Sequence, residues 1–201
     1  VRGTERSRTI TDYAESERPV AIQIIGRNAE GLLAAAQAAL ALRPNWIDVN
    51  MGCPAKKVSG KGRGAALLRE PDRVGQIMAA LARALPVPVT AKIRLGWDAN
   101  SLNFLEVATA LAQAGAAAIT VHGRTKVQGY SGEADWSAIA AVRAAVPIPV
   151  IANGDVRSAA DIAAIQAATG CRVVMIGRGA IGNPWIFQRR SAEEVPSAER
   201  A

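Results

Sequence analysis

The sequence predicts an α/β fold, and three observations support this prediction. Short runs of β-branched and other apolar residues recur along the chain, each followed by a loop and then by an alanine- and leucine-rich segment of helical period. The apolar runs contain few polar residues, as expected for parallel strands that are buried on both faces. Polar residues of types used in catalysis follow the ends of these runs. We therefore predict part of a TIM-type (β/α)8 barrel with about six βα units.

Six strands and five helices are predicted in alternation. The strands are expected at residues 20–25, 46–50, 87–93, 117–121, 148–152 and 173–176. The helices are expected at residues 29–42, 71–85, 102–114, 136–146 and 159–169. Ser158 is suited to cap the last of these helices, with Asp161 in its first turn. Gly170 directly follows that helix, where a left-handed residue often ends a helix.

The barrel is preferred to an open doubly wound sheet because of where the polar residues lie. In a closed barrel the carboxyl ends of all strands meet on one face, whereas an open sheet concentrates its ligand at one topological switch point. Polar residues here follow five consecutive strands, which favours the barrel. They are Asn50 and Cys53, Lys92 and Arg94, His122 and Arg124, Asn153 and Asp155, and Gly177 and Arg178.

The composition excludes several classes of protein. Half of the 201 residues are hydrophobic and 20% are charged, as in globular chains with one core. No apolar run reaches the roughly 18 residues of a membrane span, and the N-terminus lacks the layout of a secretory signal, so we expect no membrane partner and a cytoplasmic location. Two cysteines and one histidine are too few for a disulfide framework or a structural zinc site, so no metal is expected. The net charge of +7 suits a polyanionic partner, although a solvated basic surface explains it equally well.

The loop at residues 52–64 carries a cysteine at a strand end together with lysines, an arginine and several glycines. A positive charge from Lys56 and Lys57 would stabilise the thiolate of Cys53, which suits either acid–base or nucleophilic chemistry. The alternative is that a cysteine is a small buried apolar residue. We prefer that interpretation for Cys171, which has no such neighbours, and the reactive interpretation for Cys53.

A phosphate-binding device is predicted at the last two strands. The sequence has no Gly-x-Gly-x-x-Gly after its first strand, so a Rossmann dinucleotide site has no support. Asn153-Gly154-Asp155 ends one strand and Gly177-Arg178-Gly179 ends the next. Glycines let backbone N–H groups approach a phosphate, and an arginine adds a bidentate contact. The last two βα loops of a barrel often hold a cofactor phosphate.

Lys92 and His122 are predicted to face the same cofactor. Lys92 lies in an otherwise apolar strand, where a buried cation needs an anionic partner such as the ring edge of a cofactor. The alternative is a lysine that extends to solvent from the strand end. His122 lies at a strand end before a glycine, which suits ligand contact and a change of charge near neutral pH, or else a structural hydrogen bond.

Taken together, these segments resemble the tRNA-dihydrouridine synthase family, and the form MGCPAKK resembles its bacterial B-type subfamily. The resemblance runs from about residue 19 to 187, with several long motifs in fixed order. The motifs are DVNMGCPAKKV at 48–58, AKIRLGW at 91–97, TVHGRT at 120–125, GYSGEADW at 129–136, IANGD at 151–155, MIGRGA at 175–180 and NPW at 183–185.

The resemblance implies an FMN-dependent barrel that reduces the C5–C6 double bond of selected uridines in tRNA, with NADPH or NADH as the reductant of the flavin. It makes Cys53 the proton donor, because hydride transfer to one alkene carbon requires a general acid at the other. Asn50 and Arg124 lie where substrate contacts are expected. FMN contacts are implied for Gln23, Lys92, Asn153, Gly154, Asp155, Gly177 and Arg178, with His122 beside them.

The resemblance also implies contact with tRNA around the cysteine loop. The target uridine must leave its stack to be reduced. The loop's basic residues are expected to hold nearby phosphates, which gives affinity rather than base specificity. These residues are Lys56, Lys57, Lys61 and Arg63.

Three regions are expected along the chain. Residues 1–18 are predicted to be a loop-like segment, 19–190 a partial FMN-binding catalytic barrel, and 191–201 a polar tail. The first two barrel strands of the family and its C-terminal helical domain have no counterpart, so the predicted strands correspond to barrel strands 3 to 8. We expect a fragment that binds FMN and tRNA less well than a complete enzyme.

Two other functions stay open. The first is a flavin-dependent dehydrogenase of a free pyrimidine, of the dihydroorotate or dihydropyrimidine type, although a small substrate needs no basic cysteine loop. The second is an inactive RNA-binding remnant that retains the motifs, which the missing strands make possible for this chain.

Overall fold

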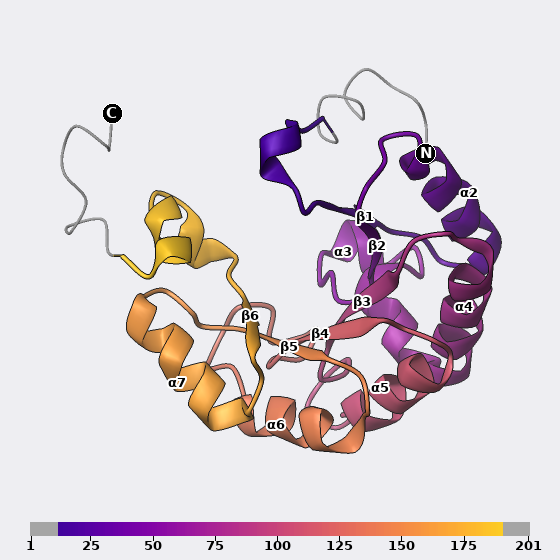
Figure 1. The fold of residues 1–201 in the computed structure, drawn as a ribbon. Helices are drawn as coiled ribbons and strands as arrows, with labels where there is room; N and C mark the ends of the chain where they lie inside the picture. Colours follow the sequence, from indigo (N-terminus) through magenta and orange to yellow (C-terminus); the bar gives the residue numbers. More distant parts are fainter. Residues whose placement is uncertain (1–11, 191–201) are drawn as a thin grey trace.

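The computed structural model describes residues 12–190, and its centre is one parallel sheet of six strands in chain order. The sheet curls into an arc, with the helices on its outer side (Figure 1). This curled half-barrel confirms the predicted partial TIM barrel. The strands are β1 (Ala21–Ile24), β2 (Trp46–Asn50), β3 (Val89–Arg94), β4 (Ala118–His122), β5 (Val150–Asn153) and β6 (Val173–Met175).

The helices that alternate with these strands are close to those predicted, with ends that differ by at most two residues. They are α2 (Ala29–Leu40), α4 (Pro71–Ala84), α5 (Phe104–Gln113), α6 (Trp136–Ala145) and α7 (Ala159–Thr169). The predicted cap of α7 is present, because Ser158 accepts a hydrogen bond from Asp161 N and the Asp161 carboxylate accepts one from Ser158 N. Gly170 ends the helix in the left-handed conformation, at φ 67°.

Five short helical segments were absent from the prediction. One of them lies within the cysteine loop at 52–64 and another begins at its last residue, so this loop is partly helical. The short segments are η1 (Glu15–Glu17), α3 (Lys56–Ser59), η2 (Gly64–Arg69), η3 (Arg178–Ala180) and η4 (Pro184–Gln188).

The two faces of the sheet differ in polarity. Ile47 and Val49 of β2 are fully buried in the hydrophobic core, on the face that the helices cover (Figure 1). The residues between and after them, Asp48 and Asn50, point to the opposite, concave face, since side chains alternate along a strand. The strands are therefore apolar mainly on one face, and the concave face carries the polar side chains from which the site is built.

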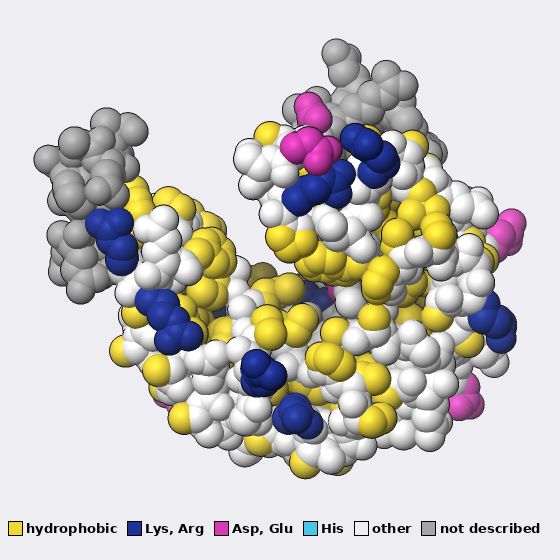
Figure 2. All heavy atoms as spheres, viewed as in Figure 1, with side chains coloured by type: hydrophobic (Ala, Val, Ile, Leu, Met, Phe, Trp, Pro, Cys, Tyr) yellow, Lys and Arg dark blue, Asp and Glu magenta, His cyan; other side chains and the backbone are white. Residues whose placement is uncertain are grey.

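The sheet is not closed within the described residues. There β1 pairs only with β2, and β6 only with β5. Figure 2 shows the opening between these edges as a notch whose walls carry hydrophobic side chains. Among residues 12–190, no helix has both the length and the apolar character needed to cross a bilayer.

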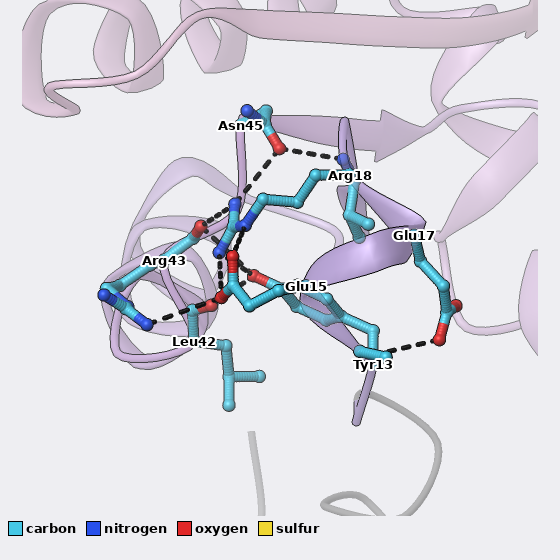
Figure 3. A network of polar contacts seen from close by, with 9 residues as sticks. Tyr13, Glu15, Glu17, Arg18, Leu42, Arg43 and Asn45 are labelled. Atoms are coloured by element: carbon cyan, nitrogen blue, oxygen red, sulfur yellow. Dashed lines mark hydrogen bonds and ion pairs between the residues drawn. The ribbon is translucent and has the colours of Figure 1, made fainter.

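The part of the N-terminal segment that the structure describes is held against the end of α2. Arg18 Nη1 donates hydrogen bonds to Arg43 O at 2.8 Å and to Asn45 Oδ1 at 3.1 Å, and Tyr13 Oη donates to Leu42 O (Figure 3). Residues 12–18 therefore include one 3-10 turn and a polar network, within the segment predicted to be loop-like. Residues 1–11 and the predicted tail at 191–201 lie outside the described residues.

Candidate functional site

A cavity of about 350 Å³ lies at the carboxyl ends of the strands, on the concave side of the sheet. It brings together side chains from all six strand ends, as the barrel prediction requires. Of the predicted site residues, Arg124 alone is absent from its lining. The lining residues are Gln23, Asn50, Gly52, Cys53, Pro54, Lys92, Arg94, His122, Tyr130, Asn153, Gly154, Asp155, Val156, Arg157, Met175, Gly177, Arg178 and Gly179.

A hydrogen-bonded chain on β1, β2 and β3 fixes the floor of this cavity. The buried Asp48 carboxylate accepts from Gln23 Nε2 at 2.7 Å and from Thr90 Oγ1 at 2.6 Å. Asn50 Nδ2 donates to Gln23 Oε1 at 2.8 Å. The orientation of the Gln23 amide is therefore set by its neighbours, with the carboxylate on one side and Asn50 on the other.

Asn50 also shapes the turn that carries the cysteine. Its Oδ1 accepts hydrogen bonds from Cys53 N at 2.9 Å and from Gly52 N at 3.2 Å. Such a side-chain bond to the backbone two or three residues later closes an Asx-type turn. Both ends of the Asn50 amide are thus engaged within the protein, although its side chain also lines the cavity.

Cys53 is half-buried at the wall of the cavity and is packed closely against the start of η2. Ala65 N donates to Cys53 O at 3.2 Å. A Cβ on Gly64, whose φ is 58°, would lie 2.9 Å from Cys53 Cβ. A side chain is excluded there both by this contact and by the left-handed backbone.

The turn that carries Cys53 is hydrogen-bonded to an arginine, whereas the two lysines expected beside the thiol extend from a short helix. Lys56 and Lys57 are exposed on α3 and are absent from the lining of the cavity. Arg94, which is 2% exposed, donates from Nε to Gly52 O at 2.9 Å. Its Nη1 donates to Thr125 O and Gly129 O at 2.9 and 2.8 Å. Arg94 therefore ties the cysteine turn to the loop after β4.

Lys92 projects from β3 into the cavity with no ion pair among residues 12–190. Burial and the positive charge of Arg94 lower its pKa to about 8, although the negative charge of Asp48 opposes this. The amine is thus a poorly solvated cation near neutral pH. An anion bound in the cavity would be the partner that such a cation needs.

His122 is 5% exposed and lies among three cations. Burial, together with the charges of Arg94, Lys92 and Arg124, lowers the pKa of its imidazole to about 3. The ring is therefore neutral near pH 7, and the prediction that His122 changes its charge near neutral pH is wrong. Arg124 Nη1 lies 3.4 Å from His122 Nε2. If Nε2 accepts a hydrogen bond from Arg124, the proton of the neutral ring lies on Nδ1.

Arg124 lies behind the wall of the cavity, where it binds the loop after β5. Its Nη2 lies 2.8 and 2.7 Å from the two carboxylate oxygens of Asp155. It also donates to Ser131 O and Gly132 O, in the loop after β4. Although burial raises the pKa of Asp155, the hydrogen bonds from Arg124 and from Ala134 N hold it below its usual value.

The two loops predicted to hold a phosphate lie side by side at β5 and β6. Gly154 has φ 129°, and a Cβ there would lie 2.7 Å from Ala134 Cβ and 3.1 Å from His122 Cδ2. A Cβ on Gly177, in contrast, would meet no atom within 4 Å, so its backbone faces open space. The side chain of Arg178 is 50% exposed. Its Nη2 lies 3.8 Å from Asp155 Oδ1. The residues fit a phosphate, because the open backbone of Gly177 and the half-exposed guanidinium of Arg178 lie at the same edge of the cavity.

Several contributors to the site were not predicted from the sequence, and Tyr130 and Asp48 are two of them. Tyr130 lines the cavity, with its ring 4.3 Å from Arg178 Cζ and 5.6 Å from Arg94 Cζ. It belongs to the motif GYSGEADW, but nothing in the spacing of that motif indicates its direction. The role of Asp48 could have been predicted from the sequence, because a carboxylate inside an apolar strand requires hydrogen-bond partners.

No group of three or more His, Cys, Asp or Glu residues suited to a metal ion occurs among residues 12–190.

The sequence matches one family along nearly its whole length. A family model described as "Dihydrouridine synthase (Dus)" matches residues 1–200. A probable tRNA-dihydrouridine synthase from Rhodobacter capsulatus is 48% identical over 167 residues, which cover 83% of this chain and 52% of that protein. The tRNA-dihydrouridine synthase B of Pseudomonas aeruginosa is 44% identical over 200 residues, which cover 97% of this chain and 60% of that protein. The chain thus spans little more than half the length of these curated relatives.

Solved structures share the fold at low sequence identity. An enolase-superfamily protein from Listeria innocua has a TM-score of 0.55 at 13% identity, over 81% of this chain and 36% of that protein. A probable mandelate racemase from Alicyclobacillus acidocaldarius has a TM-score of 0.51 at 17% identity, over 80% of this chain and 36% of that protein. At such identities the likeness concerns the fold alone.

Proposed function

The chain belongs to the dihydrouridine synthase family, and from this premise we propose that it carries the catalytic site for reducing uridine to 5,6-dihydrouridine in tRNA. The observation that carries the proposal is the composition of one cavity. Cys53 lines it together with Lys92 and with the glycine-bearing loops after β5 and β6. A candidate general acid, a cation without an ion pair among residues 12–190 and two loops suited to a phosphate thus share one space.

FMN is the cofactor that fits this cavity in our proposal. Its phosphate would be held by the backbone of Gly154 and Gly177 and by the guanidinium of Arg178. Gln23, Lys92 and Asn153 would contact the remainder, with His122 and Asp155 supporting them from the wall. When bound, FMN supplies a hydride to one carbon of the uracil double bond, and NADPH or NADH restores the reduced flavin.

Cys53 is proposed as the proton donor to the other carbon. Its Sγ would carry the proton and transfer it to the second carbon of the uracil double bond, which becomes basic as the first carbon receives the hydride. Asn50 fixes the turn through its bonds to Gly52 N and Cys53 N, so the thiol is positioned before the substrate arrives. Arg94 holds the same turn from its other side.

A neutral His122 can donate one hydrogen bond and accept another without adding a fourth positive charge beside Lys92, Arg94 and Arg124. Asn50 and Arg124 were expected to meet the substrate. In our proposal both act mainly through the loops they hold, since Arg124 lies behind the wall and the Asn50 amide is already bonded at both ends.

The proposed macromolecular substrate is tRNA in the cytoplasm. The chain carries a net charge of +7, and several cations of the cysteine loop are exposed beside the cavity. They are Lys56, Lys57, Lys61 and Arg63. Exposed cations beside the entrance favour the phosphates of an RNA over a free pyrimidine, which has none.

Complementation tests this function. The protein at its natural full length, and separately the 201-residue chain, would be expressed in a bacterial strain without dihydrouridine synthases, and dihydrouridine in purified tRNA would be measured by mass spectrometry. We expect the full-length protein to restore dihydrouridine and to purify with visible flavin absorbance. Absence of dihydrouridine from tRNA, with turnover of free uracil or dihydroorotate, would replace this proposal by the free-pyrimidine alternative.

A further inference from the structure

A second cluster of charged and aromatic side chains lies at the same end of the sheet, in loops that follow the strands, outside the cavity described above. Arg69 Cζ lies 3.9 Å from the ring centroid of Trp97, and Lys126 Nζ lies 4.2 Å from the same ring. Both are within the range of favourable cation–π contacts. These three residues, which we call the Trp97 cluster, come from η2, from the loop after β3 and from the loop after β4.

Neither cation of the cluster is ion-paired within the part of the chain that the structure describes. Among residues 12–190, neither Arg69 nor Lys126 forms a salt bridge or a side-chain hydrogen bond. The adjacent Glu70 is engaged by Arg73, whose Nη1 lies 3.0 Å from both carboxylate oxygens. The Asp98 carboxylate, which lines the adjacent cavity, accepts hydrogen bonds from Asn100 N and Ser101 Oγ. Within the described residues, two positive charges thus converge on one ring without an ion-paired carboxylate, an arrangement that a phosphate stabilises.

The backbone holds Trp97 in a fixed position. Gly96 has φ 149°, and a Cβ there would lie 2.2 Å from Ser101 O, so the turn accepts only glycine. Lys126 N donates to Gly96 O at 2.9 Å, and Val127 N donates to Trp97 O at 2.9 Å. Because the backbones of the two loops are bonded to one another, the points from which the Trp97 and Lys126 side chains extend are fixed relative to each other.

A second cavity, of about 420 Å³, opens beside the cluster. Leu68 and Leu102 supply apolar wall, and the latter is 51% exposed. Asp98 and Ser101 supply polar groups that suit the edge of a nucleobase. Arg69 also lines this cavity, and a base can stack on the plane of a guanidinium.

The cluster is connected to the cysteine turn by a single short segment. Ala65 N, near the start of η2, is bonded to Cys53 O, and Arg69 is the last residue of η2. At about 2 Å of rise per residue, η2 spans roughly 10 Å. A nucleotide next to one held at Cys53 therefore reaches the Trp97 cluster.

We propose that the Trp97 cluster and its cavity form a second nucleotide-binding site, which takes the phosphates and base of a nucleotide flanking the one that is reduced. The cations bind phosphate oxygens, and the base enters the cavity against Arg69. This site rests on the proposed function, because it presupposes an RNA substrate at Cys53.

The test compares two charge-matched double variants of the flavin-loaded full-length protein in binding an unmodified tRNA transcript across a range of salt concentrations. In the first, Arg69→Gln with Lys126→Gln removes the cluster charges but keeps the apolar stems. In the control, Arg83→Gln with Arg143→Gln removes two exposed charges from α4 and α6. We expect the cluster variant to bind tRNA about tenfold more weakly than the control variant. The slope of the logarithm of the binding constant against the logarithm of salt concentration should be smaller in magnitude by about 1.5, because two phosphate contacts are lost.

Further measurements separate this site from the proposed function and from misfolding. Flavin content and kcat at saturating tRNA should be unchanged in the cluster variant, whereas KM for tRNA should rise. Trp97→Leu, which keeps an apolar side chain, should weaken binding in the same direction with all charges present. Equal affinity and equal salt slope for the two double variants overturns the second site, even when the wild-type protein forms dihydrouridine. A wild-type protein that neither binds nor reduces tRNA overturns the proposed function itself.

Discussion

Arg124 Nη2 lies 2.7 Å from Asp155 Oδ2 and 2.8 Å from Asp155 Oδ1, and only 1% of the Arg124 side chain is exposed. This ion pair joins the end of β4 to the end of β5. It also holds Asp155 in the left-handed conformation, at φ 55°, next to the predicted phosphate loop. The pair therefore links the buried frame of the barrel to the shape of the proposed cofactor site.

Asp155→Asn is expected to lower the free energy of unfolding by about 3 kcal/mol, because it leaves a buried guanidinium without a counter-charge. Urea unfolding of the flavin-free protein measures this loss. Asp72→Asn, at an exposed position in the first turn of α4, is the matched control and should change stability by less than about 0.5 kcal/mol. Equal effects of the two substitutions would show that the ion pair contributes nothing to stability.

The buried His122 predicts a loss of stability in mild acid. Its folded pKa of about 3 is below the ordinary 6.5, so the unfolded chain binds the proton more readily. The contribution of neutral His122 to the free energy of unfolding is complete above pH 6.5 and is lost as pH falls from 6.5 toward 3. Between pH 7.5 and 5 we expect the free energy of unfolding to decrease by about 2 kcal/mol.

His122→Gln isolates this contribution, because glutamine does not titrate. The variant should lose about 2 kcal/mol less than the wild type over the same pH interval, measured by urea unfolding at each pH. Parallel pH profiles for the two proteins would contradict the buried neutral imidazole.

The alternation of apolar strands and helices was sufficient to predict the half-barrel, since buried parallel strands such as β2 leave little ambiguity in sequence. The residues at the strand ends also predicted the cavity, because a curled parallel sheet brings the carboxyl ends of its strands together independently of the loop conformations. The directions of individual side chains were not predictable. Asn50 turns toward the backbone of its own loop, Lys56 and Lys57 point to solvent from a helical turn, and Tyr130 folds back over two arginines. Each depends on loop contacts between segments far apart in sequence.

Lys92 predicts a pH dependence of flavin binding. Its pKa of about 8 in the free protein means that the amine is largely neutral at pH 9. If its charge binds the flavin, affinity for FMN should fall about tenfold between pH 7 and 9, measured by quenching of flavin fluorescence. Lys92→Arg, which stays charged, should show no such decrease. An unchanged affinity in the wild type would exclude an electrostatic role for this lysine.

Gly154 is a position where a single added methyl group is expected to disrupt the proposed cofactor site. A methyl group there meets Ala134 and His122 and must also accept φ 129°, so Gly154→Ala should abolish stoichiometric flavin binding. Gly170→Ala is the control, because it has a left-handed φ of 67° with no atom within 4 Å and should cost only about 1 kcal/mol of stability. Flavin content after purification distinguishes the two. Full flavin occupancy in the Gly154 variant would show that this loop does not contact the cofactor.

Cys53 predicts separable effects on chemistry and on cofactor binding. Cys53→Ala removes the proposed acid without filling the cavity, so the full-length variant should keep its flavin while tRNA reduction slows by about 10² to 10⁴-fold. Cys53→Ser replaces the thiol by a hydroxyl, which is slightly smaller and a far weaker acid, so this variant should resemble the alanine variant. The flavin should still be reduced by NADPH in both variants, since that step does not use the thiol. Single-turnover reduction of a tRNA transcript measures the first effect and stopped-flow flavin absorbance the second. Wild-type rates of tRNA reduction in either variant would remove Cys53 from the mechanism, and the proton would then have to come from another group at the cavity wall or from water.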